Sequence, residues 1–237
     1  MIVRVVSLVP SLTEVLATSV PGALVGITDY CTHPELDLPR VGGSKYPDLA
    51  KVLATRPELV VVNEEENRES DVDALRAAGI RVWVTPAPAT VPHALDGIEE
   101  LLTVVFGLST PDWLVQARRL WARPREQWAT AVVPVWRKPW IVLGRDTFAG
   151  DVLHRLGVAN AFAWHPERYP RPPLAELTTA GADLVVLPSE PYEFTPEDGP
   201  QCFPELPSRL VDGRLLTWHG PSLVAAHAVL TDQLRVS

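Results

Sequence analysis

A helix–strand unit occurs twice in this chain at one constant spacing. The first copy has a short helical segment that begins at Leu49 and an apolar strand that begins at Leu59. The second copy begins its helix at Leu174 and its strand at Leu184, so both positions are displaced by 125 residues. Both strands then enter an acidic loop. A repeat of this length predicts two similar lobes rather than a solenoid, although generic helix and strand patterns leave two unrelated units as the alternative.

The wider pattern is an alternation of short apolar strands with helices, which predicts an α/β fold with mainly parallel sheets covered on both faces. β-branched runs bounded by turn residues mark the strands. We expect strands at Val3 to Val9, Leu24 to Ile27, Leu59 to Asn63, Val82 to Thr85, Trp140 to Leu143, Leu184 to Leu187 and Leu215 to Trp218. We expect helices at Thr13 to Thr18, Leu49 to Ala54, Val72 to Ala78, Phe148 to Leu156 and Leu174 to Thr179.

The middle of the chain has a different pattern. Apolar residues from Val91 to Gly107 fall at helical spacing, with Thr90 placed to cap the helix. A second helix is expected from Thr110, and Pro124 interrupts it. We therefore predict an N-terminal α/β lobe at 1–88, a helical connector at 89–133 and a C-terminal α/β lobe at 134–237, with a ligand cleft between the lobes.

Charge and cysteine content exclude some classes of function. The formal charge is −8 and no run rich in Lys or Arg is present, so a nucleic-acid partner is not expected. The only cysteines, Cys31 and Cys202, form no metal-binding pair. Because a strand begins close to Met1, with no signal peptide or lipid-accepting cysteine, we expect a cytoplasmic protein without a membrane span. An extracytoplasmic location is the alternative if the chain was trimmed.

Several segments, in order along the chain, resemble one known family. The opening strand and loop at 5–14, the second strand and loop at 24–34 and the strand at 56–61 are similar to helical-backbone (class III) solute-binding proteins of ABC importers. The segments 136–140, 144–148 and 189–192 look like the cobalamin-binding branch. The resemblance implies two three-layer lobes joined by a helical backbone. It also implies a small-molecule ligand, either a tetrapyrrole such as cobalamin or a metal chelate such as an iron siderophore, and no required cofactor.

The resemblance also implies a membrane partner. Receptors of this family dock on an ABC permease through acidic residues, and Glu69 resembles such a residue. An exposed glutamate at the start of a helix is equally ordinary, so a surface role for Glu69 is the alternative.

Ligands of open α/β sheets bind beyond the carboxyl ends of the strands. That rule selects loops rich in aromatic and charged residues, which suit a large planar or macrocyclic ligand. Tyr30, Phe148 and Trp218 are the strongest individual candidates, and packing within a lobe is the alternative for each. The full set of expected ligand-binding residues is Tyr30, His33, Glu64, Glu65, Asn67, Arg145, Asp146, Phe148, Glu190, Tyr192, Trp218 and His219.

Metal binding and catalysis have weaker support in the sequence. His33 and His219 are candidate metal ligands because both fall in these loops, but neither has a helical histidine partner. No phosphate-binding glycine loop and no serine-nucleophile motif is present, and no base is assigned to Ser11. We therefore expect a binding protein and not an enzyme. The alternative is a cytoplasmic enzyme that uses a metal or tetrapyrrole on the same two-lobed scaffold.

Overall fold

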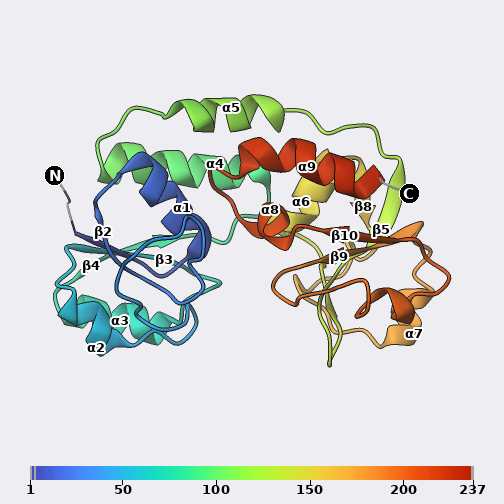
Figure 1. Cartoon of the computed structure of the whole chain (residues 1–237), viewed down its shortest axis with the longest axis horizontal. Helices are drawn as coiled ribbons and strands as arrows, with labels where there is room; N and C mark the ends of the chain where they lie inside the picture. Colours follow the sequence, from blue (N-terminus) through green and yellow to red (C-terminus); the bar gives the residue numbers. More distant parts are fainter. Residues whose placement is uncertain (1, 3, 236–237) are drawn as a thin grey trace. The chain divides into compact units, whose positions relative to one another are not determined.

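The computed structural model describes residue 2 and residues 4–235, which form two compact α/β units (Figure 1). Unit 1 comprises Met1–Ala87, Leu95–Val115 and His219–Pro221, and unit 2 comprises Pro88–Ala94, Gln116–Trp218 and Ser222–Ser237. Val3, where the first strand was expected to begin, lies outside the described residues. The chain therefore changes unit in three regions, which are near residues 88–94, inside a helix at 115–116 and near residues 219–221.

Unit 1 is built on a parallel sheet of four strands in the order β2-β1-β3-β4. All five residues of β3 are buried, as expected for an interior strand covered on both faces. Helices α2 and α3 cover one face, where Val52, Val72 and Leu75 pack against the strands, and α1 covers the other (Figure 1). The elements are β1 (Val5–Ser7), α1 (Pro10–Ser19), β2 (Leu24–Ile27), α2 (Leu49–Ala54), β3 (Leu59–Asn63), α3 (Glu69–Ala77) and β4 (Arg81–Thr85).

Unit 2 has a second parallel sheet in the order β10-β9-β5-β8, together with a separate antiparallel hairpin of β6 and β7. Every residue of β9 is buried. The elements are β5 (Ala129–Val132), β6 (Pro134–Trp136), β7 (Ile141–Val142), α6 (Phe148–Arg155), β8 (Val158–Asn160), α7 (Leu174–Thr178), β9 (Leu184–Pro188), the 3₁₀ turn η2 (Pro200–Cys202), β10 (Ser208–Val211), α8 (Gly213–Thr217) and α9 (Leu223–Arg235).

The two sheets have the same topology. Read from β8, the second sheet runs β8-β5-β9-β10, which matches β2-β1-β3-β4 strand for strand. The elements that carry the repeat also match, because α2 and α7 begin at Leu49 and Leu174, and β3 and β9 begin at Leu59 and Leu184. The prediction of two similar α/β lobes with mainly parallel sheets is thus confirmed.

Along the sequence, helical segments occupy most of the stretch between β4 and β5. Helix α4 (Val91–Glu100) continues as the π-helical turn η1 (Leu101–Val105), and α5 (Asp112–Leu120) follows. Thr90 accepts a hydrogen bond from the amide of His93 at 3.3 Å, as expected of a capping residue. Strand β5 lies in the last residues of the expected connector, and the boundaries of that connector stay a prediction. Among the described residues, no helix has the length and apolar character needed to cross a membrane.

Two expected strands are wrong in type or pairing. Residues Leu215 to Trp218 form the end of α8 and its cap, because the Asp212 carboxylate accepts a hydrogen bond from the amide of Leu215 and starts a helix there. The segment Trp140 to Leu143 contributes only β7, which pairs antiparallel with β6 and lies outside the parallel sheet. The parallel strands β5, β8 and β10 had no counterpart among the expected strands.

Candidate functional site

The loops beyond β2 and β3 in unit 1 are held in place by two buried asparagines. Asn63 ends β3, and its side-chain Nδ2 donates to the Thr85 hydroxyl at 3.1 Å, which fixes the end of β4. The side chain of Asn67 accepts a hydrogen bond at Oδ1 from the backbone N–H of Asn63 at 2.8 Å. Its Nδ2 donates to the backbone carbonyl of Ser44 at 2.7 Å. Because these groups are buried, each bond would be costly to leave unmade. The loop at 63–67 and the turn at 42–48 are therefore locked to each other.

Two exposed tyrosines lie on this locked edge. Tyr30 follows β2 and is 66% exposed, and Tyr46 lies in the turn at 42–48 and is 67% exposed. A Cβ at Gly43 would lie 3.4 Å from the Tyr30 ring, so Tyr30 lies against that same turn. Single exposed rings are normal on a protein surface, but here two of them belong to the same edge. They offer flat apolar area at low entropic cost.

Arg68 supplies a cation beside Tyr46. Its guanidinium carbon lies 4.7 Å from the centroid of the Tyr46 ring. Two of its nitrogens donate to the buried carboxylate of Asp71 at 2.8 and 2.9 Å. This bidentate pairing is the geometry that arginine and carboxylate favour, so it fixes the plane of the guanidinium. Tyr30, which lies against the turn at 42–48, together with Tyr46 of that turn and its neighbour Arg68, is called here the tyrosine platform.

The three glutamates that the sequence selected near this edge lie in different surroundings. Glu64 is exposed and accepts a hydrogen bond from the Ala87 amide at 2.8 Å, so it braces the loop after β4. The Glu65 side chain is exposed, and its amide donates to Asn63. Glu69 is exposed at the first position of α3, which is a favourable place for a negative charge.

The two candidate metal-binding histidines are in different environments. His33 is exposed, and its Nδ1 lies 3.0 Å from the hydroxyl of Thr32. His219 packs on the start of α1, with Nε2 3.5 Å from the hydroxyl of Ser11. Burial lowers the pKa of His219 to about 4, so its ring is neutral at neutral pH. Among the described residues, no group of three or more His, Cys, Asp or Glu is arranged to hold a metal ion.

In unit 2, the loop before α6 carries two exposed charged residues and is followed by a buried aromatic ring. Arg145 and Asp146 are exposed and form an ion pair at 3.3 Å. The Asp146 carbonyl accepts from Arg168, and Asp146 has a φ of 54°, a left-handed conformation that Asp adopts more readily than most residues. Phe148 is only 6% exposed and begins α6. Its burial favours packing within the protein, the alternative considered for this ring.

The remaining candidates of unit 2 also lie in packed surroundings. The Tyr192 hydroxyl donates to Asp198 at 2.5 Å, and its ring meets that of Trp136 on the hairpin edge to face at 5.7 Å. Glu190 is half-buried, and Trp218 is 7% exposed with the Arg214 guanidinium 5.8 Å from its ring centroid. Of the three rings favoured by the sequence, only Tyr30 is largely exposed.

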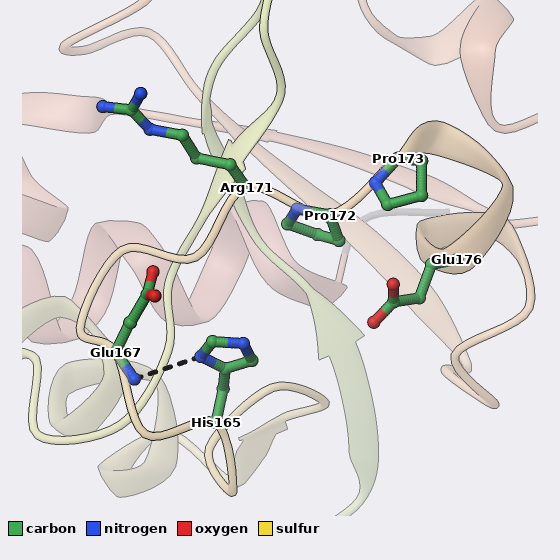
Figure 2. Close-up of a pocket in the computed structure, with 6 residues that line it drawn as sticks. All are labelled: His165, Glu167, Arg171, Pro172, Pro173 and Glu176. Carbon is green, nitrogen blue, oxygen red and sulfur yellow. Dashed lines mark hydrogen bonds between the residues drawn. The ribbon is translucent and has the colours of Figure 1, made fainter.

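A hollow of about 440 Å³ lies elsewhere on unit 2, lined by His165, Glu167, Arg171, Pro172, Pro173 and Glu176 (Figure 2). His165 accepts a hydrogen bond at Nδ1 from the Glu167 amide at 3.1 Å. In Figure 2 the carboxylates of Glu167 and Glu176 lie on either side of the His165 ring, and the Arg171 side chain extends away. Ligand pockets are mostly apolar with a few polar groups. This polar hollow is a poor fit for a large macrocycle.

Tyr46 was missed as a site residue, and Arg68, although it lies in a loop that the carboxyl-end rule selects, was not among the expected ligand-binding residues. The carboxyl-end rule selects the loops that directly follow strands, whereas Tyr46 lies just before α2. Its place on the edge depends on the contact between Asn67 and Ser44, two residues that are 23 positions apart. An aromatic residue after the glycines Gly42 and Gly43 was the available signal, since such turns lie on the surface.

Comparisons with known proteins agree with this architecture. No family model matches the sequence. A vitamin B12-binding protein of Photorhabdus laumondii is 23% identical over 193 residues, covering 78% of this chain and 70% of that protein. A vitamin B12-binding protein of Vibrio cholerae is 28% identical over 101 residues, covering 41% of this chain and 36% of that protein.

Solved structures match nearly the whole chain. The periplasmic vitamin B12-binding protein BtuF of Vibrio cholerae has a TM-score of 0.77 at 18% identity, covering 99% of this chain and 97% of that one. A periplasmic haem-binding protein of Pseudomonas aeruginosa has a TM-score of 0.79 at 23% identity, covering 98% and 92%. The haem-binding protein HutB of Vibrio cholerae has a TM-score of 0.79 at 18% identity, covering 98% and 99%.

These matches confirm the resemblance stated from the motifs. The similar structures are named as periplasmic proteins, so they do not support the expectation of a cytoplasmic protein. The chain has the fold of the vitamin B12- and haem-binding solute-binding proteins.

Proposed function

We propose that this chain is the substrate-binding component of an ABC importer and that it binds a flat, metal-bearing macrocycle or chelate. Cobalamin and haem are the leading candidates, because proteins named for binding them share the fold over almost its full length. The observation that carries the proposal within this chain is the tyrosine platform. Two rings, each about two-thirds exposed, lie beyond the carboxyl ends of the unit 1 strands.

The chemistry of the platform suits such a ligand. Tyr30 and Tyr46 can lie against the faces or edges of a macrocycle, where each ring removes apolar surface from water. Arg68 adds a positive charge that Asp71 holds in place, and it can pair with a carboxylate or phosphate on the ligand. Because the buried asparagines already order both loops, these loops lose little conformational entropy when a ligand binds.

The remaining expected contacts are kept as proposals of lesser weight. Arg145 and Asp146 offer exposed charges from unit 2, whereas Phe148, Tyr192 and Trp218 are packed and would need to expose an edge to reach a ligand. A ligand cleft between the two lobes stays a prediction.

A membrane permease is the proposed protein partner. Glu69 offers an exposed carboxylate at the start of α3, and such a group can pair with a basic residue of a permease. We propose that the protein works outside the cytoplasm, as the periplasmic proteins with this fold do.

We propose binding and not catalysis as the activity. The similar proteins are named for the ligands that they bind. The pair most like a catalytic dyad is Ser11 with His219, but its 3.5 Å separation is long. A ring whose pKa is about 4 is also a weak base for removing a serine proton at neutral pH.

The test is a titration of the purified protein with cyanocobalamin, haemin and a ferric siderophore, followed by absorbance. The expected result is a saturable spectral change with one of the three ligands and full recovery of that ligand unchanged after release. Chemical conversion of the ligand by the protein would support the enzyme alternative, and failure of all three to bind would refute the proposal.

A further inference from the structure

Each of the three regions in which the chain changes unit contributes one backbone group to a single set of hydrogen bonds within unit 2. The first region brings Val91 at the start of α4, the second brings Trp121 after the end of α5, and the third brings Leu223 at the start of α9. All three residues belong to unit 2. Their backbone groups are joined through the side chains of only three residues, Asp151 and Arg155 of α6 and Trp121 itself.

The connection is a continuous chain of hydrogen bonds. The Val91 amide donates to the Asp151 carboxylate at 2.7 Å, and Arg155 Nε donates to the same carboxylate oxygen at 2.7 Å. Arg155 Nη1 then donates to the Trp121 carbonyl at 2.6 Å. Finally, the Trp121 indole N–H donates to the Leu223 carbonyl at 2.8 Å. These residues are called here the junction network.

The junction network is largely shielded from water. The Asp151 and Arg155 side chains are 12% and 11% exposed, and Trp121 is 1% exposed. A shielded ion pair is weak evidence of stability when it is compared with a well-packed apolar pair. Removing one member is costly, however, because it leaves the other charge buried without a partner. The network thus favours one arrangement of the three segments.

Helix α6 joins this network to the loop that carries candidate ligand contacts. Asp151 is one turn into the helix, and its amide donates to the Thr147 carbonyl at 3.1 Å. Phe148 begins the helix, and Arg145 and Asp146 lie just before it. An eight-residue helix is a short rigid rod of about 12 Å. A shift of Asp151 therefore displaces the loop at 145–147.

We propose that Asp151, Arg155 and Trp121 are positioning residues for ligand binding. They touch no ligand, but they fix α6, and with it the loop at 145–147, against all three connecting segments of unit 2. Loosening the network lets the loop move, so bound ligand leaves faster. The effect on affinity depends on the proposed ligand-binding function, whereas the effect on the loop does not.

The first measurement uses hydrogen exchange without any ligand, so that it stands apart from the proposed function. In Asp151→Asn, which keeps an acceptor for Val91 but removes the charge, we expect faster exchange at the Val91 amide. We also expect it at the Gly144 amide, which precedes the loop at 145–147 and donates to the Arg168 carbonyl at 2.7 Å. Asp73→Asn is the matched control, because Asp73 forms an exposed helical ion pair with Arg76 at 3.7 Å, and it should leave those amides unchanged. Unchanged exchange at Gly144 in Asp151→Asn would overturn the proposal.

The second measurement is the dissociation rate of cyanocobalamin or haemin, whichever binds the wild-type protein. A lost charge-assisted hydrogen bond corresponds to about a tenfold change. We expect dissociation about tenfold faster in Asp151→Asn, with association nearly unchanged. If Asp151→Asn fails to fold, Trp121→Phe replaces it, because this variant keeps a buried aromatic ring while it removes the indole donor together with part of the ring. A wild-type dissociation rate together with wild-type exchange in Trp121→Phe would refute the role.

Discussion

The Arg68 guanidinium carbon lies 4.7 Å from the centroid of the Tyr46 ring, while two nitrogens of the same guanidinium bind the buried Asp71 carboxylate. The ring and the cation therefore form one ordered surface at the carboxyl edge of the first sheet. A flexible arginine side chain on a surface usually loses conformational entropy when it binds a ligand. Here the carboxylate already holds the side chain, so a ligand meets a group that is set in place.

Replacing the Tyr46 ring should weaken ligand binding. Tyr46→Ala removes a flat aromatic contact worth about 0.5–1.5 kcal/mol, which corresponds to an affinity about two- to thirteenfold lower. Tyr46→Phe keeps the ring and should bind within about twofold of the wild type. The dissociation constant from calorimetry tests both variants. Equal affinity in Tyr46→Ala and the wild-type protein would exclude the ring from the site.

Asn67 should contribute to stability as well as to loop order. Asn67→Ala removes the acceptor of the Asn63 amide and the donor to the Ser44 carbonyl, both buried. Leaving these groups unsatisfied should cost about 2–4 kcal/mol of the free energy of unfolding of unit 1. Chemical denaturation followed by circular dichroism measures the loss. Lys51→Ala, at an exposed position on α2, is the control and should change stability by less than about 0.5 kcal/mol.

Two glycines should respond in opposite directions to the same added methyl group. A Cβ at Gly213 would meet the backbone nitrogen of Glu190 and lie 2.7 Å from its Cα, so Gly213→Ala should destabilise the protein by about 1–3 kcal/mol. A Cβ at Gly97 in α4 meets nothing within 4 Å, and Gly97→Ala should stabilise by up to about 1 kcal/mol. Thermal melts compare the two. A Gly213→Ala variant as stable as the wild type would contradict the described packing of α8.

His219 should make the folded state sensitive to acid. Burial lowers its pKa from 6.5 to about 4 in the folded protein. Between those values the unfolded chain binds a proton that the folded chain does not. The contribution of the neutral His219 ring to the free energy of unfolding is therefore complete above pH 6.5. It is lost progressively as the pH falls toward 4.

Denaturation curves at several pH values test this dependence on pH. In His219→Gln, the fall in stability between pH 6.5 and 4 should be smaller than in the wild-type protein. His33→Gln is the control, because the His33 ring is exposed and takes no part in the partly buried contact between His219 and Ser11. The same pH dependence in His219→Gln and the wild-type protein would show that the acid sensitivity arises elsewhere.

The elements that were predictable from sequence are those in which one physical signal dominates. Strand β3 follows a proline and consists of apolar residues up to Asn63, and the structure has it at the expected bounds. The same holds for α2, which begins at Leu49 after the capping residue Asp48. Their copies in unit 2 follow from the constant spacing. The fold could therefore be inferred before any comparison.

The errors occur where short apolar runs are ambiguous. Leu215 and Leu216 are as apolar as a strand, and four residues are too few to distinguish a helix by period. Asp212 was the overlooked signal, because it caps the helix. Strand β10 contains Arg209, whose charge argues against a buried strand. Its side chain instead donates to the Leu234 carbonyl at 3.0 Å, a contact that no local pattern reveals.

The candidate site was less predictable than the fold for a related reason. The carboxyl-end rule located Tyr30 and Asn67, but it gives no exposure, and so Phe148 and Trp218 ranked as highly as Tyr30. Tyr46 joins the edge only through a contact that is distant in sequence. Exposure and long-range hydrogen bonding are properties of the packed chain, so they could not be read from residue order.

The most direct test of the account is calorimetric titration of the wild-type protein and a Tyr30→Ala/Tyr46→Ala double variant with cyanocobalamin and with haemin. The account predicts saturable one-to-one binding of at least one ligand by the wild-type protein. Removing both rings should reduce that affinity at least about fivefold while the circular dichroism spectrum stays the same. No binding of either ligand by the wild-type protein, or equal affinity in the double variant, would contradict it.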